Sequence, residues 1–436
     1  MIKRLLTFFF AAVMAGVSSF AQVAPIVVAE GFNKGLIGVE VDANGNLWVT
    51  ENGTGNDDGQ ITIIDPAGNK TLFMTGLPST YIQAAGEIVG SYRTYQRPDN
   101  KVLIVVGEGA HERSETLLLV DKSDFTPGTP LTLANVEQVI DHGEFVHGLG
   151  FPQSNPFNVT WDADGNIYTA DAGANSIVKW DRNTGAFSLV ATLERFPNPL
   201  PFGPPMVDPV PTKVLAKPDG TFHISQLTGF PFLQGAANVY NLDAAGNVSV
   251  HASGFTCLTD MAFDPTDGNL CVLQFGVFGQ VDSTLNFILG TPAVIKIMPD
   301  GSRDTLARGM GGLSSSFTFD AAGNVYVTDL VFGQVLKFGL VSSADEPVFT
   351  PASVRVFPNP APASEVTVAY QLEEAAEVSL EVYDINGRLV SRIQEGLRIA
   401  GAHQLRWNAA GMPAGMYAYR LRAGKALATG TVQLVR

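Results

Sequence analysis

Six oxygen-bearing side chains recur at one position of a repeated phrase in this 436-residue sequence. The phrase is clearest in VDANGNLWVTENG, TWDADGNIYTADAG and TFDAAGNVYVTD, where an apolar run meets a tight turn and an acid ends the strand that follows. The residues at that position are Glu51, Glu108, Asp171, Gln226, Gln274 and Asp329. Four carboxylates and two amides around one axis would suit Ca²⁺ or Mg²⁺, because hard cations prefer oxygen donors and the set contains no His or Cys.

The same six residues have a structural alternative. Asp, Asn and similar side chains often accept hydrogen bonds from the backbone of a following turn. The sequence therefore leaves two hypotheses open for these positions, a cation or polar-ligand site at the mouth of a channel and a set of turn caps. Calcium is a candidate at the four carboxylates, Glu51, Glu108, Asp171 and Asp329.

A second candidate for chemistry is the run from His142 to His147, which places two imidazoles beside Glu144. A histidine here could act as the base of a metal-assisted lactonase or lyase. The alternative is that these histidines only hold a loop, since neighbouring charges in a loop do not define a catalytic site. The sequence contains no GxSxG, HExxH, P-loop or dinucleotide-binding motif, which argues against those enzyme classes.

Longer loops add aromatic and acidic residues that could contact a ligand. They span Glu108–Glu115, Phe196–Pro211, Phe230–Phe232 and Phe275–Leu289. Aromatic rings beside carboxylates suit a sugar, a pigment or a peptide. The alternative is that the Phe and Pro side chains pack these loops down. We expect the loops to gather on one face of the fold.

The repeat itself predicts the scaffold that positions these residues. Turn dipeptides recur at intervals of about fifty to sixty residues: Asn44-Gly45, Asp99-Asn100, Asp164-Gly165, Asp219-Gly220, Asp267-Gly268 and Ala322-Gly323. A four-stranded propeller blade has a period of ~40–50 residues, and such dipeptides favour tight hairpins because their central residues accept positive φ. Six short β-units of this kind predict an all-β fold, a six-bladed β-propeller spanning residues 22–341.

The sixth unit has only three strands before the repeat ends at Phe338. The missing strand is expected at the other end of the chain, where IVVAEGF (Ile26–Phe32) resembles the fourth strand VHASGF of an earlier unit. We expect Ile26–Phe32 to pair with Val335–Phe338 and close the ring, which removes an unpaired sheet edge.

Charge and composition restrict the partners and the compartment. The net charge is −15, and the acidic excess falls in the propeller region, which makes nucleic acid and anionic lipid poor partners. Residues 1–21 combine Lys3 and Arg4 with an apolar run, as in a cleaved secretory signal, and no other stretch is long enough to span a membrane. Strand register predicts that Cys257 and Cys271 are too far apart for a disulfide and remain buried thiols.

A second domain is expected after a short polar linker at residues 342–351. Residues 352–436 read as six or seven strands joined by Gly, Pro and Asn turns, which predicts a small Ig-like β-sandwich. VFPNPAP, VYDINGRLV, Trp407 and MPAGMYAYRLRAG resemble the type A C-terminal sorting domain of type IX secretion (Por secretion) in Bacteroidota. That resemblance implies passage through the periplasm to the outer-membrane surface or the medium. The sequence departs from the family pattern in its last strand, which has no lysine.

The propeller region has a resemblance of its own. QLTGFPFLQGAANVYNLD (Gln226–Asp243), VHASGFTCLTDMAFDPTDGNL (Val250–Leu270) and YTADAGANSIVKWD (Tyr168–Asp181) resemble the ScyD/ScyE family of NHL-like propellers. This resemblance implies the fold and no particular reaction.

The leading functional hypothesis from the sequence is an exported, non-catalytic propeller that binds a small molecule, a glycan or a protein on its loop-rich face. Residues 352–436 would interact with the type IX secretion machinery. The alternatives are the metal-assisted lactonase or lyase, with His142 or His147 as base, and a structural surface scaffold without a ligand.

Overall fold

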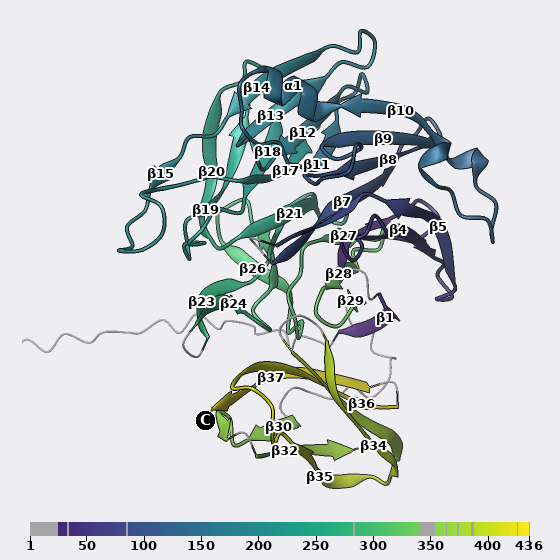
Figure 1. Ribbon diagram of the computed structural model, residues 1–436, viewed down its shortest axis with the longest axis vertical. Coiled ribbons are helices and arrows are strands. Elements are labelled where there is room, and N and C mark those ends of the chain that lie inside the picture. The colour runs from purple at the N-terminus through teal and green to yellow at the C-terminus, as the bar shows by residue number, and fades with distance from the viewer. Residues whose placement is uncertain are drawn as a thin grey trace, which may run out of the picture.

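A computed structural model describes residues 25–32, 35–83, 86–281, 284–339, 354–362, 364–372, 375–384, 388–424 and 426–435. The expected secretory signal and the expected linker at residues 342–351 lie outside these ranges. Within them, residues 26–338 form six sheets of at least four antiparallel strands each, and residues 354–435 form a separate pair of sheets. The chain is almost entirely β-structure, as the sequence predicts (Figure 1).

The strands of the six blades follow one another along the chain. Blade 1 contains β2 (Leu36–Val41), β3 (Leu47–Glu51), β4 (Gly59–Ile64) and β5 (Lys70–Leu77). Blade 2 contains β7 (Glu87–Gln96), β8 (Lys101–Val106), β9 (Thr116–Asp121) and β10 (Val136–Asp141), and blade 3 contains β11 (Pro156–Trp161), β12 (Ile167–Asp171), β13 (Ser176–Trp180) and β14 (Phe187–Thr192). Blade 4 contains β17 (Pro211–Ala216), β18 (Phe222–Gln226), β19 (Ala237–Leu242) and β20 (Val248–Phe255), and blade 5 contains β21 (Leu258–Phe263), β22 (Leu270–Gln274), β25 (Ala293–Ile297) and β26 (Arg303–Arg308).

Blade 6 joins the two ends of the propeller. It contains β27 (Phe317–Phe319), β28 (Val325–Asp329), β29 (Gln334–Phe338) and, as its outermost strand, β1 (Ile26–Glu30). β1 pairs antiparallel with β29, with Ile26 opposite Lys337 and Glu30 opposite Gln334. The innermost strands, β2, β7, β11, β17, β21 and β27, contact one another in a closed cycle. The predicted ring and its closure by the N-terminal strand are therefore observed.

Shorter elements lie in the connections between these strands. They are β6 (Ser79–Ile82), which adds to the sheet of blade 2, the two-stranded sheets β15 (Phe196–Pro197) with β16 (Met206–Val207) and β23 (Val277–Val281) with β24 (Thr284–Ile288), the 3₁₀ turns η1 (Lys122–Asp124) and η2 (Leu133–Asn135), and the helix α1 (His142–Gly148). The run from His142 to His147 is thus one short helix, capped by the Asp141 side chain, and not the loop that the sequence suggested. No helix in the described part of the chain is long and apolar enough to cross a membrane.

The repeated phrase forms a hairpin turn held by its first Asp. Asp42 Oδ1 accepts hydrogen bonds from the backbone N–H of Asn44 and Asn46, and Asp42 Oδ2 accepts one from Trp48 Nε1. Only the glycine of the Asn44-Gly45 pair has positive φ, 80°. This differs from the sequence prediction of two central residues with positive φ, because the Asp side chain closes a longer turn in which a single left-handed residue suffices.

Apolar residues pack between neighbouring blades and make the core. Trp48, Ile61 and Phe73 of blade 1 pack against Ile104 and other strand residues of blade 2, and similar clusters fill the other blade interfaces. Burial on both faces explains why the second strands lack a clean alternation of polar and apolar residues. Cys257 and Cys271 are buried free thiols, as predicted, and Phe263 pairs with Leu270 as the expected register requires.

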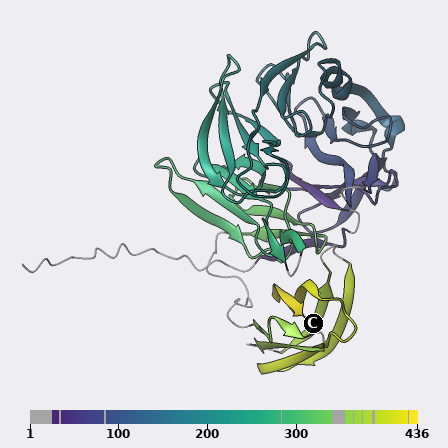
Figure 2. The same ribbon diagram turned by 60° about the vertical axis from the view of Figure 1, so that its left-hand side comes forward.

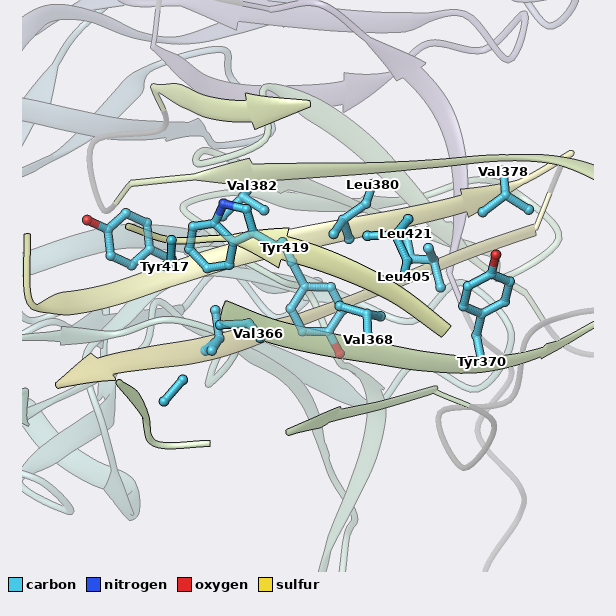
Figure 3. Packing of buried hydrophobic residues seen from close by; sticks show 14 of the residues in the cluster. Val366, Val368, Tyr370, Val378, Leu380, Val382, Leu405, Tyr417, Tyr419 and Leu421 are labelled. Carbon is cyan, nitrogen blue, oxygen red and sulfur yellow. The ribbon is translucent and has the colours of Figure 1, made fainter. Parts of the chain in front are cut away.

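The C-terminal residues form a separate β-sandwich. One sheet contains β30 (Val354–Phe357), β32 (Glu365–Leu372) and β35 (Gly401–Asn408), and the other contains β31 (Ala361–Pro362), β33 (Ala376–Tyr383), β34 (Leu389–Arg398), β36 (Gly415–Ala423) and β37 (Ala426–Val435). Figure 3 shows Val366 and Val368 of one sheet facing Leu380, Val382 and other residues of the second across a shared apolar core. We call residues 354–435 the tail domain.

Candidate functional site on the ring axis

A pocket of about 550 Å³ opens at the centre of the ring, and all six blades contribute to its lining. Several lining residues immediately precede innermost strands, as Gly35 and Val210 do, and others immediately follow second strands, as Asn52, Ala172 and Leu227 do. Both kinds of connection lie at the same end of a propeller, so the pocket is the mouth of the central channel. The expected gathering of loops on one face is therefore observed at this pocket.

One wall of the pocket is aromatic. Phe275 packs edge-to-face on Phe287, with ring centroids 4.9 Å apart, and Phe287 contacts Phe232 at 5.1 Å. Phe278 lies 5.1 Å from both Phe232 and Phe287 and extends the cluster outward. The exposed ring of Phe230 continues this wall at the pocket rim. These rings come from the loops after the second strands of blades 4 and 5, which the sequence singled out as candidate ligand contacts.

The wall formed by blades 2 and 3 is acidic. Glu108 and Glu87 line it beside Tyr92 and Asn155, and Asn155 Nδ2 donates to Glu108 Oε1 at 3.2 Å. Burial raises the pKa of Glu108 above its ordinary value, and the nearby charges of Glu87 and other carboxylates raise it further. Burial likewise raises the pKa of Glu87. The pocket thus combines an apolar aromatic side with two carboxyl groups whose pKa is raised by burial.

Of the six residues predicted to ring the mouth, Glu108 lines the pocket. The other five are the last residues of second strands, and each accepts hydrogen bonds from nearby residues. The carboxylates accept as follows: Glu51 from Gln60 Nε2, Asp171 from Ser154 Oγ, and Asp329 from Gly312 N and Phe332 N. The amides accept as follows: Gln226 from Asn238 N and Tyr240 Oη, and Gln274 from Thr256 N. Within the described ranges, no group of three or more His, Cys, Asp or Glu residues could hold a metal ion. Asp171 and Asp329 accept from backbone N–H groups, as turn and loop caps do, whereas Glu51 pairs with Gln60 across β3 and β4. Ca²⁺ binding by the four carboxylates stays a prediction.

The three residues of the histidine run are also separated. His142 is fully buried, with Nε2 2.9 Å from Asp171 Oδ2. His147 is half-exposed and lies 2.8 Å from Glu115 Oε2, while its Nδ1 faces the Phe151 carbonyl. Glu144 is in the first turn of α1, and its backbone N–H is capped by Asp141. None of the three lines the axial pocket, so they do not form a joint acid–base site there.

A cluster of buried polar residues fills the channel below the pocket, and sequence reasoning missed it. Lys213 Nζ lies 3.3 Å from Asp260 Oδ1 and donates to Tyr95 Oη at 3.0 Å. Arg93 donates to the backbone carbonyls of Ile37 and Ser315, which line the pocket, and its Nη2 lies 3.9 Å from Asp260 Oδ2. These residues close the floor of the pocket with a charged plug that spans the ring.

The plug occupies one repeated position on the innermost strands. In blades 1 to 5 the strand register shifts just before that position, as at a β-bulge, and the residues there are Gly38, Arg93, Asn158, Lys213 and Asp260. Ser316 lies at the matching place in blade 6, where its Oγ donates to Asp260 Oδ2 at 2.8 Å. A bulge re-aims a side chain. The sequence signal is weak: in blades 2 to 6 a charged or polar residue stands at this position of the inner strand.

Comparisons with known proteins identify the tail domain. Residues 355–434 match the family model for the secretion system C-terminal sorting domain. The chain therefore carries the signal for export by type IX secretion to the cell surface or the extracellular space. A search of curated proteins finds no match.

Solved structures with similar folds cover about three quarters of this chain. A protein of unknown function from Bacteroides thetaiotaomicron is 14% identical, covers 73% of this chain and 75% of its own, and has a TM-score of 0.47. A virginiamycin B lyase from Staphylococcus aureus is 13% identical over 73% of this chain and 99% of its own, with a TM-score of 0.41. A glucose dehydrogenase is 13% identical over 73% of this chain and 100% of its own, with a TM-score of 0.48. At this level of similarity they carry no conclusion about activity.

Proposed function

We propose that this exported propeller binds a small organic molecule in the axial pocket without converting it. The ligand class is a compound with an apolar, ring-bearing body and a cationic or hydrogen-bond-donating group. The observation that carries the proposal is the pairing of an aromatic wall with Glu108 and Glu87 across one cavity of about 550 Å³. A cavity of this size and lining is typical of sites for small ligands, which need apolar contact and a few placed polar groups.

The two sides of the pocket would contact different parts of the ligand. Phe232, Phe275 and Phe287 offer ring faces and edges to an apolar body. Glu108 offers an acceptor that is held in place by Asn155. Burial raises the pKa of both glutamates, and the charge of Glu87 raises the pKa of Glu108 further. A bound cation would therefore ease ionisation of Glu108, whereas an anion would oppose it.

The same contacts argue against a lactonase or lyase based on the histidine run. A general base must come within hydrogen-bond reach of its substrate. His142 is enclosed with Asp171, and His147 is engaged by Glu115 and the Phe151 carbonyl outside the pocket lining. The resemblance to the ScyD/ScyE family remains a proposal about ancestry and adds no reaction.

Three probes with one aryl body test the proposal: naphthylmethylammonium, naphthalenemethanol and naphthoate. Binding to the mature full-length chain is measured by calorimetry. We expect Kd values on the order of 0.1–1 mM for the cation, weaker binding of the alcohol, and the weakest binding of the carboxylate. Phe287→Ala should weaken all three probes, whereas Phe357→Ala, which removes an exposed ring in the tail domain, should change none.

Two results would contradict the proposal. If Phe287→Ala and wild type bind all three probes equally strongly, the probes do not bind in the axial pocket. Chromatographic detection of a product from lactone or aryl-ester analogues, lost in Glu108→Gln, would make the site catalytic.

A further inference from the structure

The tail domain packs against the seam where the propeller ring closes. β1 and β29 are the N-terminal and C-terminal strands of the ring, and Figure 1 shows both on the side that faces the tail domain. Figure 2 shows the tail domain below the ring in a second view. β1 also contacts β37 directly. β1 is only five residues long and is the outermost strand of its blade. A terminal edge strand that is hydrogen-bonded to only one other strand, as β1 is to β29, opens locally with a small free-energy cost.

One side chain of the tail domain touches both sides of this seam. Arg420, on β36, donates from Nη1 to Glu30 Oε2 at 3.3 Å and to Gln334 Oε1 at 2.9 Å. Glu30 and Gln334 are the pair that face each other across β1 and β29. A single guanidinium therefore bridges the last residue pair of the ring closure.

The rest of the Arg420 side chain is fixed within its own domain. Nε donates to Glu381 Oε2 at 2.8 Å, and Nη2 donates to Glu381 and, at 2.7 Å, to Tyr383 Oη. The residue is 7% exposed. Because a planar guanidinium held by the Glu381 carboxylate and the Tyr383 hydroxyl has a defined orientation, this arrangement places Nη1 at the seam rather than leaving it to a flexible surface contact.

Two further contacts reinforce the same junction. Arg422 Nη2 donates to Glu30 Oε2 at 2.6 Å, so the Glu30 carboxylate accepts from two arginines of the tail domain. Phe332, in the turn before β29, packs edge-to-face on Tyr383 with ring centroids 4.8 Å apart, and Val331 and Leu289 join this buried apolar cluster. The backbone of the same turn accepts a hydrogen bond from the segment after β1: the Phe32 N–H donates to the Gly333 carbonyl.

We propose that the tail domain is a clasp for the propeller: while it is docked, Arg420 and Arg422 hold β1 onto β29 and keep the ring closed. The surface that receives it consists of the Glu30–Gln334 pair and the apolar side chains of Leu289, Val331 and Phe332. Its partner is the β36 face of this chain's own sorting domain. A ring from which the domain has detached keeps its β1–β29 hydrogen bonds but loses both arginines at Glu30, so β1 opens more often.

Hydrogen–deuterium exchange of the mature full-length chain tests the clasp. In Arg420→Gln and in Glu30→Gln, the amides of Val27–Glu30 should exchange about tenfold faster than in wild type, since local opening sets their rate. Amides of β12 in blade 3, which is remote from the seam, should keep their wild-type rate in both variants. Arg406→Gln is the matched control, because Arg406 lies on the other sheet of the tail domain, in an exposed pair with Glu365.

The double variant shows whether the two residues act together. If Glu30 and Arg420 act through one contact, Arg420→Gln combined with Glu30→Gln should exchange no faster than the faster single variant. Unchanged β1 exchange in both single variants would overturn the clasp. So would an acceleration in Arg406→Gln equal to that in Arg420→Gln. Glu30→Gln keeps the test informative if Arg420→Gln disrupts the tail domain, because Glu30 is half-exposed and belongs to the propeller.

Discussion

His142 Nε2 lies 2.9 Å from Asp171 Oδ2, and neither side chain has any exposed surface. The contact joins α1, which follows blade 2, to the end of β12 in blade 3. Asp171 also accepts from Ser154 Oγ, Asn155 N and Ala174 N, and Asn155 in turn donates to Glu108 in the pocket. The pair therefore holds Asn155, which in turn holds Glu108 at the acidic wall of the pocket, and neither His142 nor Asp171 lines the pocket.

Replacement of His142 by Ala should lower the free energy of unfolding by about 2–4 kcal/mol, because it leaves the buried Asp171 carboxylate without that partner. Urea denaturation measures the loss, and His111→Ala, in a neighbouring loop, is the control with a change below ~1 kcal/mol. Burial acts to raise the pKa of Asp171, but the hydrogen bond and charge of His142 hold it below its ordinary value. This stabilisation is present above the ordinary Asp pKa and is lost as pH falls through the lower folded value. A variant as stable as wild type would contradict the supporting role.

The ring could be predicted from the sequence because each blade repeats its turn. Asp42 and Asp320 each fix a Gly-containing hairpin with the same hydrogen bonds to the backbone N–H groups of the residues two and four positions on. The closing strand was also predictable, because blade 6 lacked a strand and Ile26–Phe32 offered one. Both signals can be read from short stretches of sequence without knowing which strands pair.

The functional geometry was less predictable because a polar or charged residue inside an inner strand is a weak signal that does not reveal the bulge before it. The sequence directs attention to residues at the ends of second strands, such as Gln226 and Asp329, which the structure buries as caps. A one-residue register shift before Lys213 and before Asp260 instead turns those side chains toward each other across the ring. Register depends on pairing with a neighbouring strand, so a single strand's sequence does not determine it.

The buried pair of Lys213 and Asp260 yields a stability prediction. Lys213→Met should destabilise the chain by about 3–5 kcal/mol, because it leaves Asp260 with less compensating charge in the ring centre. Lys213→Met combined with Asp260→Asn should lose less than the sum of the two single variants, since each removes the partner of the other. Lys217→Met, which changes a partly exposed lysine directly after β17, should cost under ~1 kcal/mol. Additive losses in chemical denaturation would show that the two residues do not interact.

Glu40 should make stability depend on pH. Burial raises the pKa of Glu40 to about 7, with Asp260 adding to the effect and Lys213 and Arg93 opposing it. Between the ordinary Glu pKa and about 7 the folded chain keeps a proton that the unfolded chain releases. The contribution of this group to stability therefore decreases as pH rises through that window. Glu40→Gln should gain in Tm relative to wild type between pH 5 and pH 7.5, and parallel Tm curves for the two proteins would contradict this.

His147 should titrate above an ordinary histidine. Its pKa is raised by the hydrogen bond to the Phe151 carbonyl and by the Glu115 carboxylate. The stability that this group contributes is fully present below the ordinary His pKa and is lost as pH rises through the higher folded value. Titration of the imidazole signals by NMR should show the His147 pKa falling in Glu115→Gln, whereas Glu112→Gln, an exposed carboxylate in the same loop, should leave it unchanged. An unchanged His147 pKa in Glu115→Gln would contradict the contact.

Ligand binding in the axial pocket should depend on the charge of Glu108. Burial and the charges of Glu87, Glu115 and Asp171 raise the pKa of Glu108, so ionisation begins at higher pH than for a free glutamate. Affinity for naphthylmethylammonium should therefore increase as pH rises above the ordinary Glu pKa, while affinity for naphthalenemethanol should stay nearly constant. Glu108→Gln should weaken binding of the cation about ten- to a hundredfold near neutral pH and flatten its pH curve, since a charged hydrogen bond contributes about 1.5–3 kcal/mol.

The contrast between the two probes separates recognition from folding. A damaged pocket would weaken the cation and the alcohol alike, whereas loss of the Glu108 charge weakens the cation selectively. Glu112→Gln removes an acid of the same loop whose side chain is 81% exposed, and it should leave both curves as in wild type. If Glu108→Gln instead retained the wild-type pH curve for the cation, the carboxylate beside Asn155 would not be the group that recognises charge, and the polar half of the proposed site would have to be abandoned.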